Sequence, residues 1–241
     1  MARALHIQNE STDPAVPFVE ALEAHGFEVR TLHPYKGDPL PETLDGIDAI
    51  VAGGGLVDTH QAGEVPWLLR EIQLVREALV RGTPYMGLCL GAQILTEAAG
   101  GTVYRSDPHE VGWHEVQLLP AARDDELFGG LPERFPAMQW HYYACRAADG
   151  MVELAQNASA LQAVRVGDAA WGTQFHIEVT RPVLMVWLDM GEEDLAKNGY
   201  PRERFLASID EHLDAHLGIG RTLADRFAAL AESRAALRRA G

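Results

Sequence analysis

The first hundred residues alternate between short apolar runs and amphipathic segments, and this alternation is the strongest constraint on the fold. Four apolar runs are expected strands, at residues 4–7, 27–32, 47–52 and 84–88. Three segments with apolar residues at helical spacing are expected helices, at about residues 15–25, 66–81 and 91–99. Strands that alternate with helices favour a mostly parallel sheet covered on both faces. We therefore predict an open α/β fold.

The pattern changes after Thr102. Strand-like segments follow at residues 111–119, 135–145 and 161–175, with Gly167 and Asp168 as a hairpin turn in the last of them. Beyond residue 189 the chain becomes charged and helical, and Gly218 and Gly220 separate two apolar helix faces. We predict an antiparallel extension of the sheet and then C-terminal helices.

The domain division follows from the size of these parts. Residues 1–190 are predicted to form one domain, and residues 191–241 a helical extension packed on it. About fifty residues bury too little apolar surface to make a strong core of their own. The extension is therefore not expected to be an independent domain.

Charge and cysteine content limit the partners and the compartment. The formal net charge is -15, and the chain has two lysines, which argues against nucleic acid because phosphate contacts need clustered basic side chains. The N-terminus lacks the apolar region of a signal peptide, and no apolar run reaches the length of a membrane span. Two cysteines do not make a disulfide framework. We expect a cytoplasmic protein with neither a nucleic-acid nor a membrane partner.

Cys89 stands between Gly87 and Gly91, where an expected strand meets an expected helix. This Gly-x-Cys-x-Gly pattern is the cysteine counterpart of a nucleophile elbow. The glycines allow close backbone approach, and the N-terminus of the following helix favours the thiolate. Cys145 has no such setting and is expected in the core, which is the commoner place for a lone cysteine.

His176 and Glu178 can supply the base and the orienting group that a cysteine nucleophile needs. Residues two apart on a strand face the same side, so both can stand together at a strand end while Ile177 points into the core. A His-x-Glu pair alone is weak evidence for a catalytic site, since a surface strand face explains such a pair in most proteins. The pair indicates catalysis here because the sequence also contains Cys89 in a nucleophile-elbow pattern.

Three glycines, residues 53–55, end the expected strand at 47–52. An exposed glycine amide can point at a developing oxyanion without obstruction by a side chain. Gly54 is the preferred donor, Gly53 and Gly55 are the alternatives, and the amide of Leu90 would complete an oxyanion hole. The glycine patterns of phosphate-binding loops are absent here, which leaves a flexible loop as the other interpretation.

Taken in this order, the three segments resemble the class I glutamine amidotransferases, particularly the branch similar to the glutaminase part of GMP synthetase. The resemblance covers roughly residues 46–190 and includes four further segments, at residues 65–68, 100–103, 110–113 and 138–141. It implies a flavodoxin-like fold, without a metal or cofactor.

The resemblance also implies roles for individual residues. Cys89 would attack the γ-carboxamide of glutamine to form a γ-glutamyl thioester, His176 would carry protons, and Glu178 would hold His176. The candidates for binding the substrate are Gly55, Gln93 and His141.

The chain departs from the family pattern at three positions. Leu56 follows the three glycines where Gly-Gly-Pro is common, which puts the rigidity of this loop in doubt. Ile177 stands between His176 and Glu178 where proline is common. Tyr143 replaces an acidic residue often found two after His141, which leaves open how the substrate amino group is held.

Other histidines lie near acidic residues without an ordered set of metal ligands. His212 and His216 are four apart on an expected helix beside Glu211 and Asp214, and His109 and His114 flank Glu110. Solvated charged faces are the expected explanation for both groups.

Three functions stay open. The first is a glutaminase that delivers ammonia to an acceptor on a separate synthetase subunit, since the chain is too short to hold a synthetase domain as well. The second is a stand-alone γ-glutamyl hydrolase or peptidase. The third is a non-catalytic thiol sensor of the same fold, although a sensor does not need His176 and Glu178.

Overall fold

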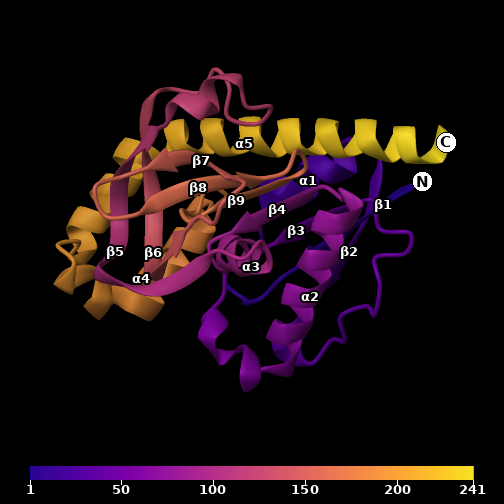
Figure 1. The fold of residues 1–241 in the computed structure, drawn as a ribbon. Coiled ribbons are helices and arrows are strands. Elements are labelled where there is room, and N and C mark those ends of the chain that lie inside the picture. Colours follow the sequence, from indigo (N-terminus) through magenta and orange to yellow (C-terminus); the bar gives the residue numbers. More distant parts are fainter. Residues whose placement is uncertain (241) are drawn as a thin grey trace.

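A single mixed sheet of nine strands forms the centre of the protein, and the computed structural model describes it within residues 1–240 (Figure 1). The strand order is β2-β1-β3-β4-β9-β8-β6-β5-β7, and the first five strands run parallel. These five are β1 Ala2–Ile7, β2 Phe27–Leu32, β3 Ala49–Ala52, β4 Tyr85–Leu88 and β9 Ala170–Thr173. Their order corresponds to the 2-1-3-4-5 arrangement of flavodoxin, so the predicted flavodoxin-like fold is confirmed.

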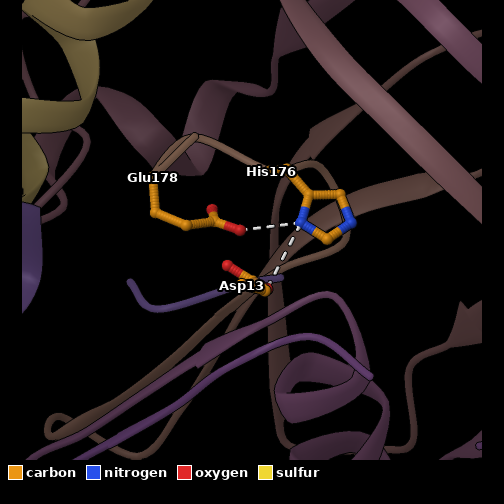
Figure 2. Close-up of side chains that lie close together, drawn as sticks. All are labelled: Asp13, His176 and Glu178. Carbon is orange, nitrogen blue, oxygen red and sulfur yellow. Dashed lines mark hydrogen bonds and ion pairs between the residues drawn. The ribbon is translucent and has the colours of Figure 1, made fainter. Parts of the chain in front are cut away.

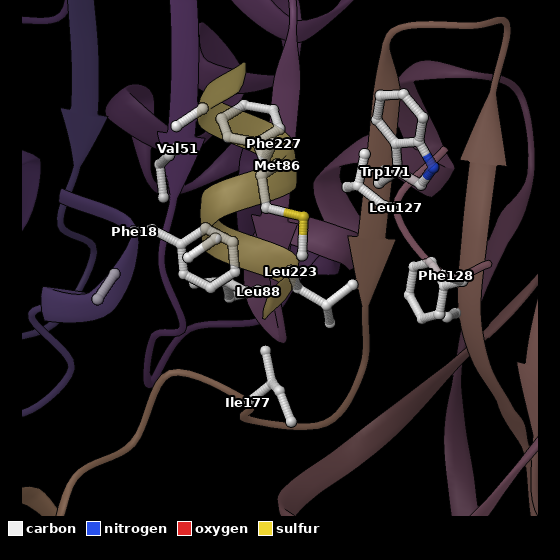
Figure 3. Packing of buried hydrophobic residues seen from close by; sticks show 14 of the residues in the cluster. Phe18, Val51, Met86, Leu88, Leu127, Phe128, Trp171, Ile177, Leu223 and Phe227 are labelled. Atoms are coloured by element: carbon white, nitrogen blue, oxygen red, sulfur yellow. The ribbon is translucent and has the colours of Figure 1, made fainter. Parts of the chain in front are cut away.

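Helices cover both faces of the parallel part because its strands are apolar on both sides. In β3, Val51 packs toward α1 (Val16–Ala24) and α5 (Arg202–Ala240), while Ile50 packs toward α2 (Pro66–Arg81) and α3 (Leu90–Ala98). Figure 3 shows the first of these cores, where Phe18 of α1 and Phe227 of α5 lie near Met86. The described part of the chain also contains the 3-10 helices η1 Pro34–Lys36, η2 Thr59–Gly63 and η3 Pro120–Asp124.

The antiparallel part begins with β5, which pairs with β6 along almost its whole length. Its strands are β5 Thr102–Leu118, β6 Arg134–Arg146, β7 Met151–Gln156 and β8 Leu161–Val166. The predicted turn at Gly167 joins β8 to β9, and β9 also pairs parallel with β4, so it connects the two parts of the sheet. Strand β7 was not predicted.

The C-terminal part consists of α4 (Arg181–Lys197) and α5 (Arg202–Ala240). The prediction of a break at Gly218 and Gly220 is wrong, because α5 runs through both glycines as one helix of 39 residues (Figure 1). Gly220 lies against the backbone of Ile177, where a Cβ atom would overlap the carbonyl oxygen. Close packing, rather than a turn, therefore requires this glycine.

The two ends of α5 pack on different parts of the protein. Phe205 and Ile209 join α4 against β5 and β6, whereas Leu223 and Phe227 enter the core beneath the parallel strands. The predicted domain boundary at residues 190/191 falls within α4, beside a non-helical Gly191, and the division stays a prediction. Within residues 1–240, no helix is both long and apolar enough to cross a membrane.

The two glycines of α5 give opposite expectations for stability. Gly218→Ala should raise the free energy of unfolding by about 1 kcal/mol, because alanine favours helix and nothing lies within 4 Å of the added Cβ. Gly220→Ala should lower it by about 1–3 kcal/mol, because the added atom collides with the backbone of Ile177. Urea unfolding of both variants measures this difference, and equal effects would contradict the packing described for Gly220.

Candidate active site

Cys89 occupies a strained turn between β4 and α3. Its φ of 50° and ψ of -100° lie outside the regions that a residue with a side chain ordinarily adopts. Its amide donates a hydrogen bond to Thr173 of β9 at 2.8 Å. A Cβ on Gly87 would overlap the backbone of Gly91, and one on Gly91 would overlap the carbonyl of Ala52. Both glycines of the sequence pattern are therefore needed for the turn to fit.

His176 and Glu178 follow β9 in a loop, not on the strand that the sequence predicted. The amide of His176 donates to Met138 of β6 at 2.9 Å, and Ile177 between the two residues is buried in the core. Nδ1 of His176 lies 2.7 Å from Oε1 of Glu178, the distance of a charge-assisted hydrogen bond (Figure 2). The predicted pairing of imidazole and carboxylate is present, although its backbone setting differs.

Asp13 is a second acidic partner of His176 that the sequence analysis missed. Its Oδ2 lies 3.7 Å from Nδ1 of His176 (Figure 2). The same oxygen accepts a hydrogen bond from the amide of Gly54 at 2.7 Å. Residues 9–14 have the composition of a turn and helix cap, but no side chain caps α1, which begins after Ala15. The composition of this segment therefore indicates helix capping, whereas the fold turns the side chain of Asp13 inward.

Burial and charge together set the protonation of this group. Burial alone would lower the pKa of His176, but the charges of Cys89 and Glu178 and its hydrogen bonds to both outweigh burial and hold that pKa well above 6.5. Burial, and then the charge of Glu178, raise the pKa of Asp13 to about 7. The arrangement therefore favours an imidazolium beside the Cys89 sulfur, with Glu178 as its counter-ion.

Asp13, His176 and Glu178 each offer one atom within 4.8 Å of the others, which is close enough for a cation as well. The Nδ1 to Oε1 distance of 2.7 Å is that of a hydrogen bond. The absence of a metal at this group stays a prediction.

The three glycines after β3 differ in what their amides contact. Gly53 donates to Ile7 at 3.0 Å and Gly54 donates to Asp13 at 2.7 Å. The amides of Gly55 and Leu90 have no protein acceptor among residues 1–240. The preferred oxyanion donor, Gly54, is thus already engaged, and of the three glycines Gly55 is the one with a free amide beside that of Leu90.

A cavity of about 200 Å³ opens onto the Cys89 sulfur. Its lining residues are Glu10, Thr12, Asp13, Gly55, Leu56, Cys89, Trp140, His176, Trp187, Met190 and Gly191. Helix α4 supplies much of this wall, which sequence patterns did not reveal. The ring of Trp187 stands edge-on to His176 with centroids 4.7 Å apart, and its indole nitrogen donates to the carbonyl of Thr12 at 3.1 Å.

Gln93 and His141 do not line this cavity. Gln93 donates to Gln174 at 3.4 Å, and Gln174 in turn donates to the Cys89 sulfur at 3.7 Å. His141 is buried 3.3 Å from Glu110 in the antiparallel part. Gln93 is therefore connected to the Cys89 sulfur through one side chain, and His141 belongs to another network. Their roles in substrate binding stay predictions.

The expectation of solvated faces around Glu110 and His216 is wrong. Glu110 is buried and accepts hydrogen bonds from Asn157 and Gln162 at 2.5 and 2.8 Å, which compensate its charge. His216 is fully buried edge-on to Trp113, and burial lowers its pKa to about 4, so it is neutral. Periodicity did not show that the first half of α5 turns this residue inward.

Gly54→Ala should slow the reaction of Cys89 with iodoacetamide about tenfold or more. The added Cβ would lie 2.5 Å from Oδ2 of Asp13 and 2.9 Å from Cε1 of His176, so the imidazole that stabilises the thiolate must move. Mass spectrometry of the labelled protein measures the rate. Gly63→Ala is the matched control, since nothing lies within 4 Å of its added Cβ, and equal rates in the two variants would refute the contact.

Comparison with known structures agrees with this geometry. A glutamine amidotransferase from Thermotoga maritima superposes with a TM-score of 0.83, covering 94% of this chain and 98% of that one at 24% sequence identity. At this level of identity the likeness establishes the fold alone.

Three relatives are similar to this chain in amino-acid sequence. The glutamine amidotransferase-like protein YfeJ of Salmonella typhimurium is 25% identical over 87% of this chain and 88% of its own length. GMP synthase of Aeropyrum pernix is 31% identical over 67% of this chain, and the match spans 32% of the synthase. A gamma-glutamyl-L-1-hydroxyisopropylamide hydrolase of a Pseudomonas species is 28% identical over 69% of this chain and 60% of the hydrolase.

The family model of class-I glutamine amidotransferases matches residues 18–183, well over half of the chain and most of the region in which the sequence resembles the family. The relatives include a GMP synthase, so the predicted branch is also supported. The chain belongs to the class-I glutamine amidotransferase family.

Proposed function

We propose that the protein hydrolyses the γ-amide of glutamine, or of a γ-glutamyl relative, through a γ-glutamyl thioester on Cys89. The observation that carries this proposal is the shared cavity of Cys89 and His176, with His176 held by Glu178 at 2.7 Å. A thiolate, an imidazolium and an orienting carboxylate are the groups that acyl transfer from an amide requires.

The reaction divides into acylation and hydrolysis. The Cys89 thiolate attacks the γ-carbonyl carbon, and the amides of Gly55 and Leu90 donate to the oxyanion that develops. His176 then gives its proton to the nitrogen as the C–N bond breaks, which releases ammonia or an amine. A water molecule, losing a proton to His176, attacks the thioester and frees glutamate and the thiolate.

The fate of the released ammonia decides between the candidate functions. In an amidotransferase, ammonia passes to an acceptor site, which in this case would be on a separate synthetase subunit. One relative is named a glutamine-hydrolysing GMP synthase, and the chain matches about a third of its length. The acceptor subunit and the cytoplasmic location stay proposals.

A stand-alone γ-glutamyl amide hydrolase is the second candidate, and the lining of the cavity favours it. Trp140 and Trp187 form an apolar wall with ring centroids 5.8 Å apart. Leu56 and Met190 stand at the cavity with 78% and 64% of their surfaces exposed. An N-alkyl amine gains apolar contact from such a wall, whereas ammonia gains none. The Pseudomonas relative is named for the hydrolysis of such an amide.

A comparison of glutamine with γ-glutamyl-isopropylamide tests both candidates. Glutamate release from either should need Cys89, and Cys89→Ser should lower kcat/KM by about a thousandfold or more. Cys145→Ser is the control, because Cys145 does not line the cavity and a serine hydroxyl can still donate to Gln174 as the Cys145 thiol does at 3.6 Å, so kcat/KM should stay within about twofold.

The ratio of the two substrates separates the candidates. A higher kcat/KM for the isopropylamide supports the hydrolase, and a higher value for glutamine supports the glutaminase. A Cys89 that reacts with peroxide but neither turns over these amides nor is labelled by a glutamine-analogue electrophile would contradict the proposal and leave the thiol sensor.

A further inference from the structure

We propose that Asp13 is a positioning residue that couples the glycine loop to the His176–Glu178 pair. Its one carboxyl group fixes the amide of Gly54, next to the Gly55 donor, and stands beside the imidazole. This inference rests on the proposed function, since it assigns Asp13 a part in forming the thioester on Cys89.

The contacts of Asp13 join three parts of the chain that are distant in sequence. Oδ2 accepts the Gly54 amide at 2.7 Å and lies 3.7 Å from Nδ1 of His176. Figure 2 shows its other oxygen facing the carboxylate of Glu178. No donor among residues 1–240 reaches Oδ1 of Asp13 or Oε2 of Glu178. A proton on Oδ1 of Asp13 would give this oxygen a hydrogen bond to the carboxylate of Glu178 that it faces.

A structural role alone does not account for this placement. Asp13 does not cap α1, because the helix begins after Ala15 and no side chain caps it. Asp13 is nearly fully buried and lines the reactive cavity, where an unpaired carboxylate is costly. Burial and the charge of Glu178 raise its pKa to about 7, so a large share of this carboxyl is protonated near neutral pH. Asp13 therefore acts through hydrogen bonds more than through charge.

The backbone around Asp13 is held as firmly as its side chain. The carbonyl of the preceding residue, Thr12, accepts the indole N–H of Trp187 at 3.1 Å, and Trp187 packs edge-on to His176. The space at Gly54 is closed as well, because a Cβ there would lie 2.5 Å from Oδ2 of Asp13. The same Cβ would lie 2.9 Å from Cε1 of His176, so Gly54 packs against both Asp13 and the imidazole.

Asp13→Ala and Asp13→Asn test the coupling, with Glu20→Gln on α1 as a control that removes one acidic group away from the cavity. Asp13→Ala should lower kcat by about tenfold to a hundredfold and change KM by less than about threefold, because a loosened oxyanion donor acts in the transition state. Asp13→Asn should restore most of kcat, because its amide oxygen still accepts the Gly54 amide. A kcat for Asp13→Ala within about twofold of the control, or no recovery in Asp13→Asn, would overturn the proposal.

Labelling of Cys89 with iodoacetamide separates this proposal from the proposed function, since it needs no substrate. Asp13→Ala should slow labelling of Cys89 relative to the control, and Asp13→Asn should recover it; equal rates in all three would overturn the role of Asp13. Wild-type protein that labels at Cys89 but turns over no γ-glutamyl amide would overturn the proposed function alone.

If Asp13→Ala does not fold, as judged by circular dichroism, Asp13→Asn decides: it should keep labelling near the control rate. Activity abolished by EDTA would also overturn the proposal, since hydrogen bonds alone need no cation.

Discussion

The close crossing of three backbone segments at Cys89 is the constraint on which the rest of the site depends. Gly87 lies against Gly91, and Gly91 lies against Ala52 of β3, so the start of α3 sits directly over two parallel strands. A residue with a positive φ such as Cys89 costs about 1–3 kcal/mol. The hydrogen bonds from Cys89 to Thr173 and from Tyr85 to Gly91, both at 2.8 Å, fix the turn in this conformation. The strained turn therefore places the Cys89 sulfur at the carboxyl end of the parallel strands, where the cavity opens.

The buried charges beside Cys89 are compatible with the fold because each has a partner. His176 is surrounded by the sulfur, Glu178 and Asp13, and the aromatic edge of Trp187 excludes water from one side. In such an environment electrostatic interactions are stronger than at the surface. Removing one partner leaves an uncompensated charge, which costs more than the pair contributes. The protonation of His176 therefore depends both on its charged partners and on the packing of Trp187 from α4 against its ring.

Local patterns in the sequence were sufficient for β1 to β4 of the parallel part and for the turn that carries Cys89, whereas β9 was expected in the antiparallel extension. Strand β2 and helix α2 agree with their predicted ranges, because period and turn residues are local signals. The glycines around Cys89 indicated the elbow for the same reason. The pair of His176 and Glu178 was also identified, although it lies in a loop where the strand argument does not apply.

The features that were missed depend on contacts between distant segments. Asp13 stands in a segment composed like a helix cap, and only the fold turns it toward Gly54. Trp187 belongs to α4, whose place over the cavity follows from packing rather than periodicity. Gly220 was read as a break, whereas it allows α5 to approach Ile177. In each case tertiary contacts override the local preference of the residue.

Rapid-quench intact-mass spectrometry on the wild-type protein with a γ-glutamyl amide tests the central claim most directly. The account expects a transient species heavier by one γ-glutamyl group, with the added mass on the peptide that contains Cys89, and the same species persisting longer when water attack is slowed by replacing His176. Turnover of the amide without any such species, or with the added mass on another residue, would contradict it.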